Sequence, residues 1–302
     1  MVERLSFHDQ IQRNKLKSIA LIVIIFIVFI ILGYLVSIAL DPSYFFLIMI
    51  FAIIFSLSYI SISYYNSHKI ALASVNAKPA SREKHRMLYH VVESMSLASG
   101  LPTPKIYIME SPQINAFASG RDPQHAVICV TAGMLEKLNK QELEGVIAHE
   151  MSHIANFDVR FMTLTAILVG MIAIIAQIFL RSLWFTSYSS DRRNAKTQAI
   201  IIIIAILVAI LAPIAAQLVS LAISRKREFT ADATAVKFTR YSPGLTNALK
   251  KIKHEHVSPE DKKHYSSAIA PLFISDPFKK KIQGLFSTHP DIDTRIRRLE
   301  QM

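Results

Sequence analysis

The chain has 302 residues, of which 52% are hydrophobic, and its formal net charge is +12. Its mean hydropathy is +0.34, and the apolar residues lie in a few long runs, which excludes an ordinary soluble domain and indicates membrane spans. The basic residues flank these runs, so the charge is better explained by membrane topology than by nucleic acid binding. The single cysteine, Cys129, excludes an internal disulfide, and its apolar surroundings predict a buried thiol.

The first apolar run, residues 19–40, is long enough to cross the roughly 30 Å hydrocarbon core as a helix. Its length, and the second run that follows at once, argue against a signal peptide cleaved after Ser37-Ile38-Ala39. A turn at Asp41-Pro42-Ser43 leads into this second run, 44–64, and together the runs predict a helical hairpin. Lysines and arginines concentrate on the side to which both ends return, which predicts that this side is cytoplasmic.

After the hairpin the sequence changes to patterns of a water-facing domain. Residues 81–99 have the period of an amphipathic helix that ends at Gly100-Leu101-Pro102. Short strand-like runs separated by proline or glycine then predict a small sheet, and residues 140–157 predict a helix. The three strand-like runs are Lys105–Met109, Asn115–Ser119 and Ala126–Thr131.

Two further apolar runs, 161–180 and 199–223, predict a second hairpin. Basic residues lie on both of its sides, so the charge pattern leaves open whether this hairpin crosses the membrane completely. Residues 225–237 and 243–254 predict two helices after it.

The segment His149-Glu150-Met151-Ser152-His153 lies within the predicted helix 140–157. Histidines four residues apart share one face of a helix and can bind one zinc ion, while Glu150 is offset by about 100° and can reach a water molecule on the metal as a general base. The alternative is a helix with two surface histidines and no metal.

A catalytic zinc ion needs a third protein ligand. One class of enzymes uses a histidine six residues after the second one, but that position holds Val159, and Asn156 replaces the glycine of the same pattern. Glu228 is the best candidate, and Asp232, one turn later, can accept a hydrogen bond from the ring nitrogen that does not bind the metal. The alternative is a solvated helix face on which these acids pair with neighbouring basic residues.

Four patterns in this order resemble those of the HtpX-like membrane zinc endopeptidases, which are related to the CAAX prenyl proteases. They are His-Glu-x-x-His at 149–153, Glu-Phe-x-x-Asp at 228–232, Asn115-Ala116-Phe117-Ala118, and Thr288-His289-Pro290 followed by Arg295. The resemblance covers nearly the whole chain. It implies zinc ligands at His149, His153 and Glu228, an edge strand at Asn115, Ala116, Phe117 and Ala118 that binds extended substrate, and His289 as a catalytic residue near the oxyanion.

Several of these positions also have plainer interpretations. Asn115 is typical of an Asx-type turn before a buried strand, and His289 of a structural histidine before a proline. We expect Arg295 to have a structural role.

The resemblance implies an α+β, mostly helical membrane protein with about four transmembrane helices in two hairpins and a gluzincin-type metalloprotease domain that contains a small sheet. The expected parts are an N-terminal membrane hairpin (1–66), the first part of a cytoplasmic protease domain (67–160), a second membrane hairpin (161–223) and the second part of the protease domain (224–302). His153 lies eight residues before Phe161, about 12 Å if the helix continues, so the site is expected near the membrane surface.

The expected function is hydrolysis of peptide bonds in membrane or misfolded proteins, as quality control in the cell membrane, with one zinc ion per chain and the site facing the cytoplasm. The expected partners are polypeptide substrates and the lipid bilayer, with no nucleic acid; the sequence does not specify an oligomer. Alternatives are a CAAX-type prenyl-protein processing protease and a non-catalytic zinc-binding membrane scaffold. Non-haem iron is the formal alternative metal, although the adjacent Glu150 favours hydrolysis.

Overall fold

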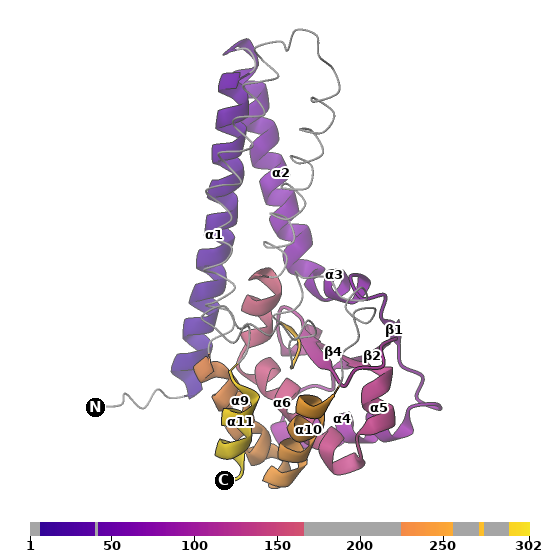
Figure 1. The fold of residues 1–302 in the computed structure, drawn as a ribbon. Helices are drawn as coiled ribbons and strands as arrows, with labels where there is room; N and C mark the ends of the chain where they lie inside the picture. Colours follow the sequence, from indigo (N-terminus) through magenta and orange to yellow (C-terminus); the bar gives the residue numbers. More distant parts are fainter. Residues whose placement is uncertain (1–6, 40–41, 166–224, 256–271, 275–289) are drawn as a thin grey trace, which may run out of the picture.

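The computed structural model describes residues 7–39, 42–165, 225–255, 272–274 and 290–302. This part of the chain is mostly helical, with one small mixed sheet (Figure 1), as the sequence predicts. The helices are α1 (Phe7–Ala39), α2 (Phe45–Tyr65), α3 (Ser67–Ala73), α4 (Arg86–Ser99), α5 (Ala132–Lys137), α6 (Lys140–Ala155), α9 (Arg225–Thr239), α10 (Ser242–His254) and α11 (Ile292–Leu299), with short 3-10 turns η1 (Pro42–Tyr44) and η2 (Pro123–His125). The predicted second hairpin lies, beyond residue 165, outside the described residues.

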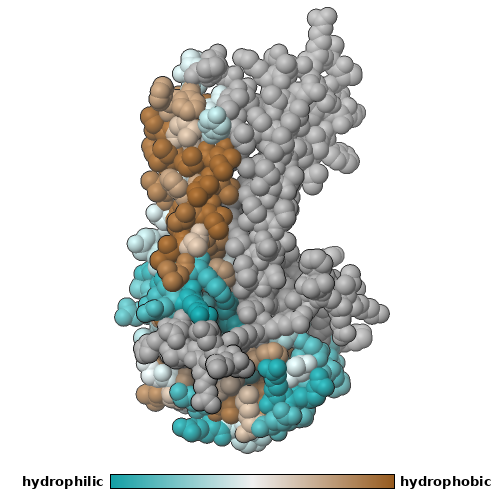
Figure 2. Space-filling view, turned by 90° about the vertical axis from the view of Figure 1, so that its left-hand side faces the viewer, coloured by the Kyte–Doolittle hydropathy of each residue, from teal (hydrophilic) through white to brown (hydrophobic). Residues whose placement is uncertain are grey.

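Helices α1 and α2 form the first predicted hairpin and extend side by side away from the sheet (Figure 1). Both are long and apolar enough to cross a membrane, over Ile11–Ile31 and Phe45–Tyr65. Only 28% and 6% of these windows are buried, so neither is the core helix of a soluble domain. Figure 2 shows their apolar side chains gathered in one band above a hydrophilic region. This exposure fits contact with lipid.

The sheet has the strand order β1-β2-β4-β3. Its strands are β1 (Lys78–Pro79), β2 (Lys105–Met109), β3 (Ala116–Ser119) and β4 (Val127–Thr131). β2 and β4 are parallel, whereas β1 pairs antiparallel with β2 and β3 antiparallel with β4. The sequence predicts the last three strands but not β1, whose two residues are too few to show an alternating pattern.

The two faces of the sheet belong to two different apolar cores. Because side chains alternate along a strand, Ile128 and Val130 of β4 face the core formed with α4, α6 and α10. Phe117 of β3 and Cys129 of β4 face a second core, which also contains Leu21 and Ile25 of α1. Burial raises the pKa of the Cys129 thiol, which fits the expected buried thiol. The sheet therefore lies between the helices of the domain and the base of the membrane hairpin.

Helix α6 begins with a capping box. The Asn139 side chain accepts the Glu142 backbone N–H, and the Glu142 side chain accepts the Asn139 N–H. The predicted end at Phe157 is wrong: α6 ends at Ala155, and Phe157 has a left-handed φ of 58° before a new helical segment starts at Asp158. The distance of about 12 Å between His153 and Phe161 holds only for a continuous helix, and this condition is not met.

Other predicted bounds also differ from the structure by a few residues. The amphipathic helix begins at Arg86 rather than at residue 81, because residues 82–84 form a turn, and it ends as predicted at Gly100. The predicted helix 225–237 extends to Thr239.

Helices α6 and α10 approach closely at Gly145. A Cβ atom at this position would lie 2.4 Å from the Leu245 backbone nitrogen and 2.7 Å from its Cα. Backbone atoms cannot rotate away as a side chain can, so only glycine permits this contact. The close packing fixes the helix that carries both histidines of the motif.

Replacing Gly145 with alanine is expected to force α6 and α10 apart and to destabilise the protein by about 1–3 kcal/mol. Thermal unfolding of the full-length protein in detergent measures the change. Glu144→Ala is the matched control. Glu144 forms a surface ion pair with Lys140 at 3.7 Å, and losing this pair should cost less than about 0.5 kcal/mol. An unchanged Tm for Gly145→Ala would show that the close contact does not constrain the packing.

Candidate metal centre

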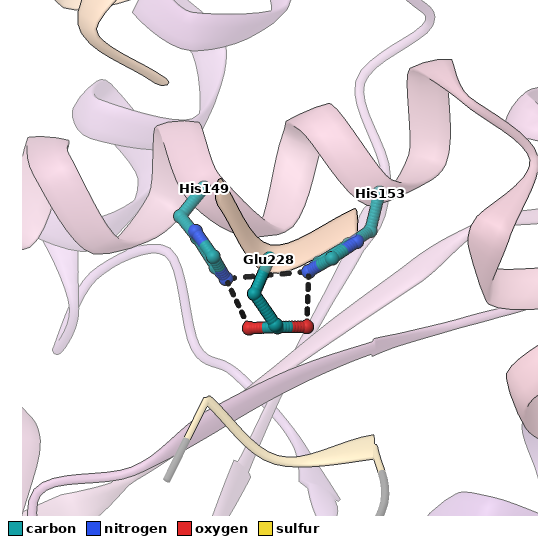
Figure 3. Close-up of side chains that lie close together, drawn as sticks. All are labelled: His149, His153 and Glu228. Atoms are coloured by element: carbon teal, nitrogen blue, oxygen red, sulfur yellow. Dashed lines mark hydrogen bonds and ion pairs between the residues drawn. The ribbon is translucent and has the colours of Figure 1, made fainter. Parts of the chain in front are cut away.

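The two histidines of the motif project from one face of α6, as their spacing requires (Figure 3). Both are buried, with exposed fractions of 0% for His149 and 4% for His153. Their Nε2 atoms lie 3.2 Å apart. The alternative of two surface histidines is therefore wrong for this helix.

Glu228, in the first turn of α9, faces both imidazoles (Figure 3). Its Oε2 lies 3.6 Å from His149 Nε2, and its Oε1 lies 3.7 Å from His153 Nε2. Glu228 and Asp232 are each 2% exposed, so the alternative of a solvated acidic helix face is also wrong. One ligand atom from each of the three residues lies within 4.8 Å of the other two.

The chemistry of these donors fits a zinc ion. Two nitrogens that bind one tetrahedral zinc at 2.0–2.1 Å are about 3.3–3.4 Å apart, close to the 3.2 Å between His149 and His153. Two imidazoles and one carboxylate are also the donor set of hydrolytic zinc sites that keep a fourth position for water. Within the described residues this is the group of histidines and acids suited to hold a metal.

A carboxylate lies next to the second ring nitrogen of each histidine. Asp232 Oδ1 is 3.0 Å from His149 Nδ1, and Asp158 Oδ2 is 3.1 Å from His153 Nδ1. An imidazole that donates its Nδ1–H to a carboxylate keeps the lone pair of Nε2 for a metal. Arg295 Nη2 is also 3.4 Å from His149 Nδ1, but the shorter contact with Asp232 assigns Nδ1 as the donor.

Arg295 of α11 holds Asp232 in place. Its Nε and Nη2 donate to the two Asp232 oxygens at 2.9 and 2.7 Å, and its Nη1 donates to the Ile274 carbonyl at 3.3 Å. The side chain is 2% exposed, so this fork-shaped pair lies away from solvent. Arg295 Nη1 also lies 3.7 Å from Glu228 Oε2, which brings one guanidinium group against both acids of α9.

The neighbouring carboxylates favour the protonated, positively charged form of His149. Burial disfavours a charged histidine, but hydrogen bonds with Asp232 and Glu228 outweigh it and raise the pKa of His149 to about 9. For Asp232, burial opposes ionisation, yet the Arg295 guanidinium and His149 hold its pKa below the ordinary value. A divalent cation at Nε2 supplies the same compensation as a proton on His149.

Glu150 is 1% exposed and lies at the boundary between α6 and the sheet. Burial raises the pKa of its carboxyl, against the opposing effects of His149, His153 and the Ala118 backbone N–H. A raised pKa makes this carboxylate a stronger base, which is better suited to take a proton from water. The contact with Ala118 also places β3 beside this group.

The predicted substrate-binding segment forms the outer edge strand of the sheet, β3. Asn115 Oδ1 accepts the backbone N–H of the next residue, Ala116, at 3.0 Å, whereas an Asx-type turn would use the N–H two residues on. The outer edge is in use: the Ile274 N–H donates to the Ala116 carbonyl at 3.0 Å, and Phe117 forms an antiparallel bridge with Phe273. An extended peptide can use the Ala116 carbonyl only by replacing Ile274.

Sequence reasoning missed Asp158 and the contact of Arg295 with Asp232. The only signal for Asp158 was an acid five residues after His153, followed by an apolar run. Arg295 was noted, but nothing in the sequence places α11 against α9. The predicted catalytic residue His289 lies outside the described residues.

Comparison with known protein families identifies the family of this chain. The model of peptidase family M48 matches residues 82–302. The chain belongs to peptidase family M48. Membership confirms the predicted resemblance and the predicted class, a membrane metalloendopeptidase.

Relatives called Protease HtpX homolog match over most of their length. The one from Caldanaerobacter subterraneus subsp. tengcongensis is 45% identical over 84% of each chain. The one from Dictyoglomus thermophilum is 41% identical over 98% of this chain and 95% of the relative. Among solved structures, the crystal structure of S. mikatae Ste24p matches with a TM-score of 0.47 and 18% identity, covering 95% of this chain and 65% of the other.

Replacing Arg295 with alanine is expected to destabilise the protein by about 3–5 kcal/mol, because it leaves the buried Asp232 carboxylate without its cation. Arg295→Lys should be intermediate, since lysine keeps the charge but loses the fork-shaped contact. Arg297→Ala is the matched control on α11, where the side chain is exposed. Chemical denaturation in detergent measures all three, and equal stability of Arg295→Ala and Arg297→Ala would contradict the assigned role of the pair.

Proposed function

We propose that this metalloendopeptidase binds one zinc ion per chain through His149, His153 and Glu228 and hydrolyses peptide bonds with Glu150 as the general base. The convergence of three donors within 4.8 Å carries this proposal. A purely structural zinc site normally has four protein ligands, often including cysteine. Three ligands and a neighbouring buried carboxylate support a catalytic role better than a scaffold role.

The residues of the site divide the reaction among them. When bound, zinc would polarise the scissile carbonyl and make the attacking water more acidic. Glu150 takes the proton from that water and later delivers it to the leaving amine. Asp232 and Asp158 hold the two imidazoles with Nε2 directed to the shared position. We retain the family-based prediction that His289 supports the developing negative charge.

We also propose that β3 binds the substrate as an added strand. Asn115, Ala116, Phe117 and Ala118 are next to the general base, since the Ala118 N–H reaches the Glu150 carboxylate. Main-chain pairing tolerates many side chains, which suits a protease that removes misfolded proteins. Substrate would replace the hydrogen bond that Ile274 makes to Ala116.

We further propose a multi-pass protein whose active site lies at the cytoplasmic surface of the cell membrane and whose substrates include membrane proteins. Several contacts support this position of the site. Asn14, within the first apolar window, reaches the turn after α6 at 3.0 Å. Phe161 and Leu164 are buried in the same core as Leu21. Basic residues at the foot of the hairpin, including Lys15 and Arg160, fit the positive-inside rule.

Glu150→Gln is expected to keep about one zinc ion per chain but to lower kcat for peptide cleavage by about 10²–10⁴-fold, because the amide cannot take a proton. Metal analysis and cleavage of an unfolded protein substrate by full-length protein in detergent measure the two effects. Glu144→Ala, on the same helix, should keep both zinc and activity. Full cleavage by Glu150→Gln would sink the assignment of the general base.

Glu228→Ala is expected to lose zinc during purification, because it removes the only carboxylate among the proposed ligands. Lys237→Ala, at an exposed position of the same helix, should retain it. Metal analysis of the two purified variants measures the difference. Stoichiometric zinc in Glu228→Ala would remove Glu228 from the ligand set.

A further inference from the structure

Asn14 is a buried polar residue near the start of α1, between Arg13 and Lys15. It is 7% exposed. A buried amide is costly unless it is hydrogen-bonded. Its Nδ2 donates to the Asn156 carbonyl at 3.0 Å and to Asp158 Oδ1 at 2.7 Å. Asn156 belongs to the turn that directly follows α6, and Asp158 begins the next helical segment.

Asp158 connects this amide to the metal centre. Its Oδ1 also lies 2.9 Å from Arg227 Nε, and its Oδ2 lies 3.1 Å from His153 Nδ1. Asp158 is 1% exposed, and Arg227 directly precedes the proposed ligand Glu228. One buried carboxylate thus contacts α1, α9 and one of the two histidines.

The turn that precedes Asp158 has a conformation that needs support. Phe157 is in the left-handed region, with φ of 58°, which costs a residue other than glycine roughly 1 kcal/mol. Helix α1 holds the turn twice: Asn14 donates to the Asn156 carbonyl, and Lys15 Nζ lies 4.6 Å from the centroid of the Phe157 ring. Helix α1 therefore adds to the contacts with Arg227 and His153 that fix the direction of the Asp158 carboxylate.

We propose that Asn14 is a positioning residue of the metal centre, which acts through Asp158 on the orientation of His153. Docking of the first membrane helix therefore sets the zinc affinity of a site on another part of the chain. The inference rests on the metal site of the proposed function, but not on its proteolytic activity. Asn14 touches neither metal nor substrate.

The test measures metal binding by full-length protein in detergent, without any substrate. Partners behind a ligating histidine typically contribute 10–100-fold to metal affinity. Asp158→Asn should therefore weaken zinc binding by about 10–100-fold, and Asn14→Ala by about 3–10-fold, as measured by competition with a chromogenic chelator. Both should change the visible spectrum of the cobalt-substituted protein, which reports ligand geometry.

Ser18→Ala is the matched control. Ser18 is buried one turn further along α1, and its Oγ donates to the Asn14 backbone carbonyl at 2.9 Å, within the helix itself. It should keep wild-type zinc affinity and the wild-type cobalt spectrum. If Asn14 only stabilised the fold, Asn14→Ala would lower Tm while leaving affinity and spectrum at the values of Ser18→Ala, and the proposal would be wrong.

A reciprocal exchange keeps the test decisive if Asn14→Ala fails to fold. Asn14→Asp places two carboxylates against each other and should weaken zinc binding more than alanine does. If Asn14 acts through Asp158, Asn14→Asp should weaken zinc binding at least about threefold less in the Asp158→Asn background than in the wild-type chain. Equal weakening in the two backgrounds would overturn the inference. Absence of cleavage by the zinc-loaded wild-type protein would instead count against the proposed function alone.

Discussion

The buried contact between imidazoles and carboxylates where α6 meets α9 is the interaction on which the rest of the structure depends. Acids taken out of water must be compensated by cations or donors. Here Arg295 compensates Asp232, Arg227 and Asn14 compensate Asp158, and the two histidines face Glu228. These partners come from α1, α6, α9 and α11, so satisfying the charges also fixes how the helices assemble.

The sheet and the membrane hairpin also fix the position of helix α6. One face of the sheet packs on α6, and the other packs on the base of α1, so the helix with the histidines lies a fixed distance from the membrane helices. Edge strand β3 brings its backbone to Glu150. In the proposed function, the strand edge would bind extended chains and the metal centre would lie close to lipid.

The sequence predicts those parts that depend on local spacing. The period of four between His149 and His153, the hairpin around residue 42 and three strands all follow from patterns within a few residues. The sequence does not predict contacts between residues that are far apart along the chain. Nothing local shows that Asn14 reaches Asp158 across 144 positions, or that Arg295 pairs with Asp232. The end of α6 was missed because part of the support of the left-handed Phe157 comes from Lys15 of α1, which is distant in the sequence.

The most direct test of the central claim is metal-dependent cleavage by the purified full-length protein. An unfolded soluble polypeptide is offered to protein in detergent before chelation, after removal of metal and after addition of one equivalent of zinc. The account predicts cleavage that disappears with the metal and returns with zinc, because His149, His153 and Glu228 hold the ion beside Glu150. Cleavage that persists in the metal-free protein, or its absence when zinc is bound at one ion per chain, would contradict the account.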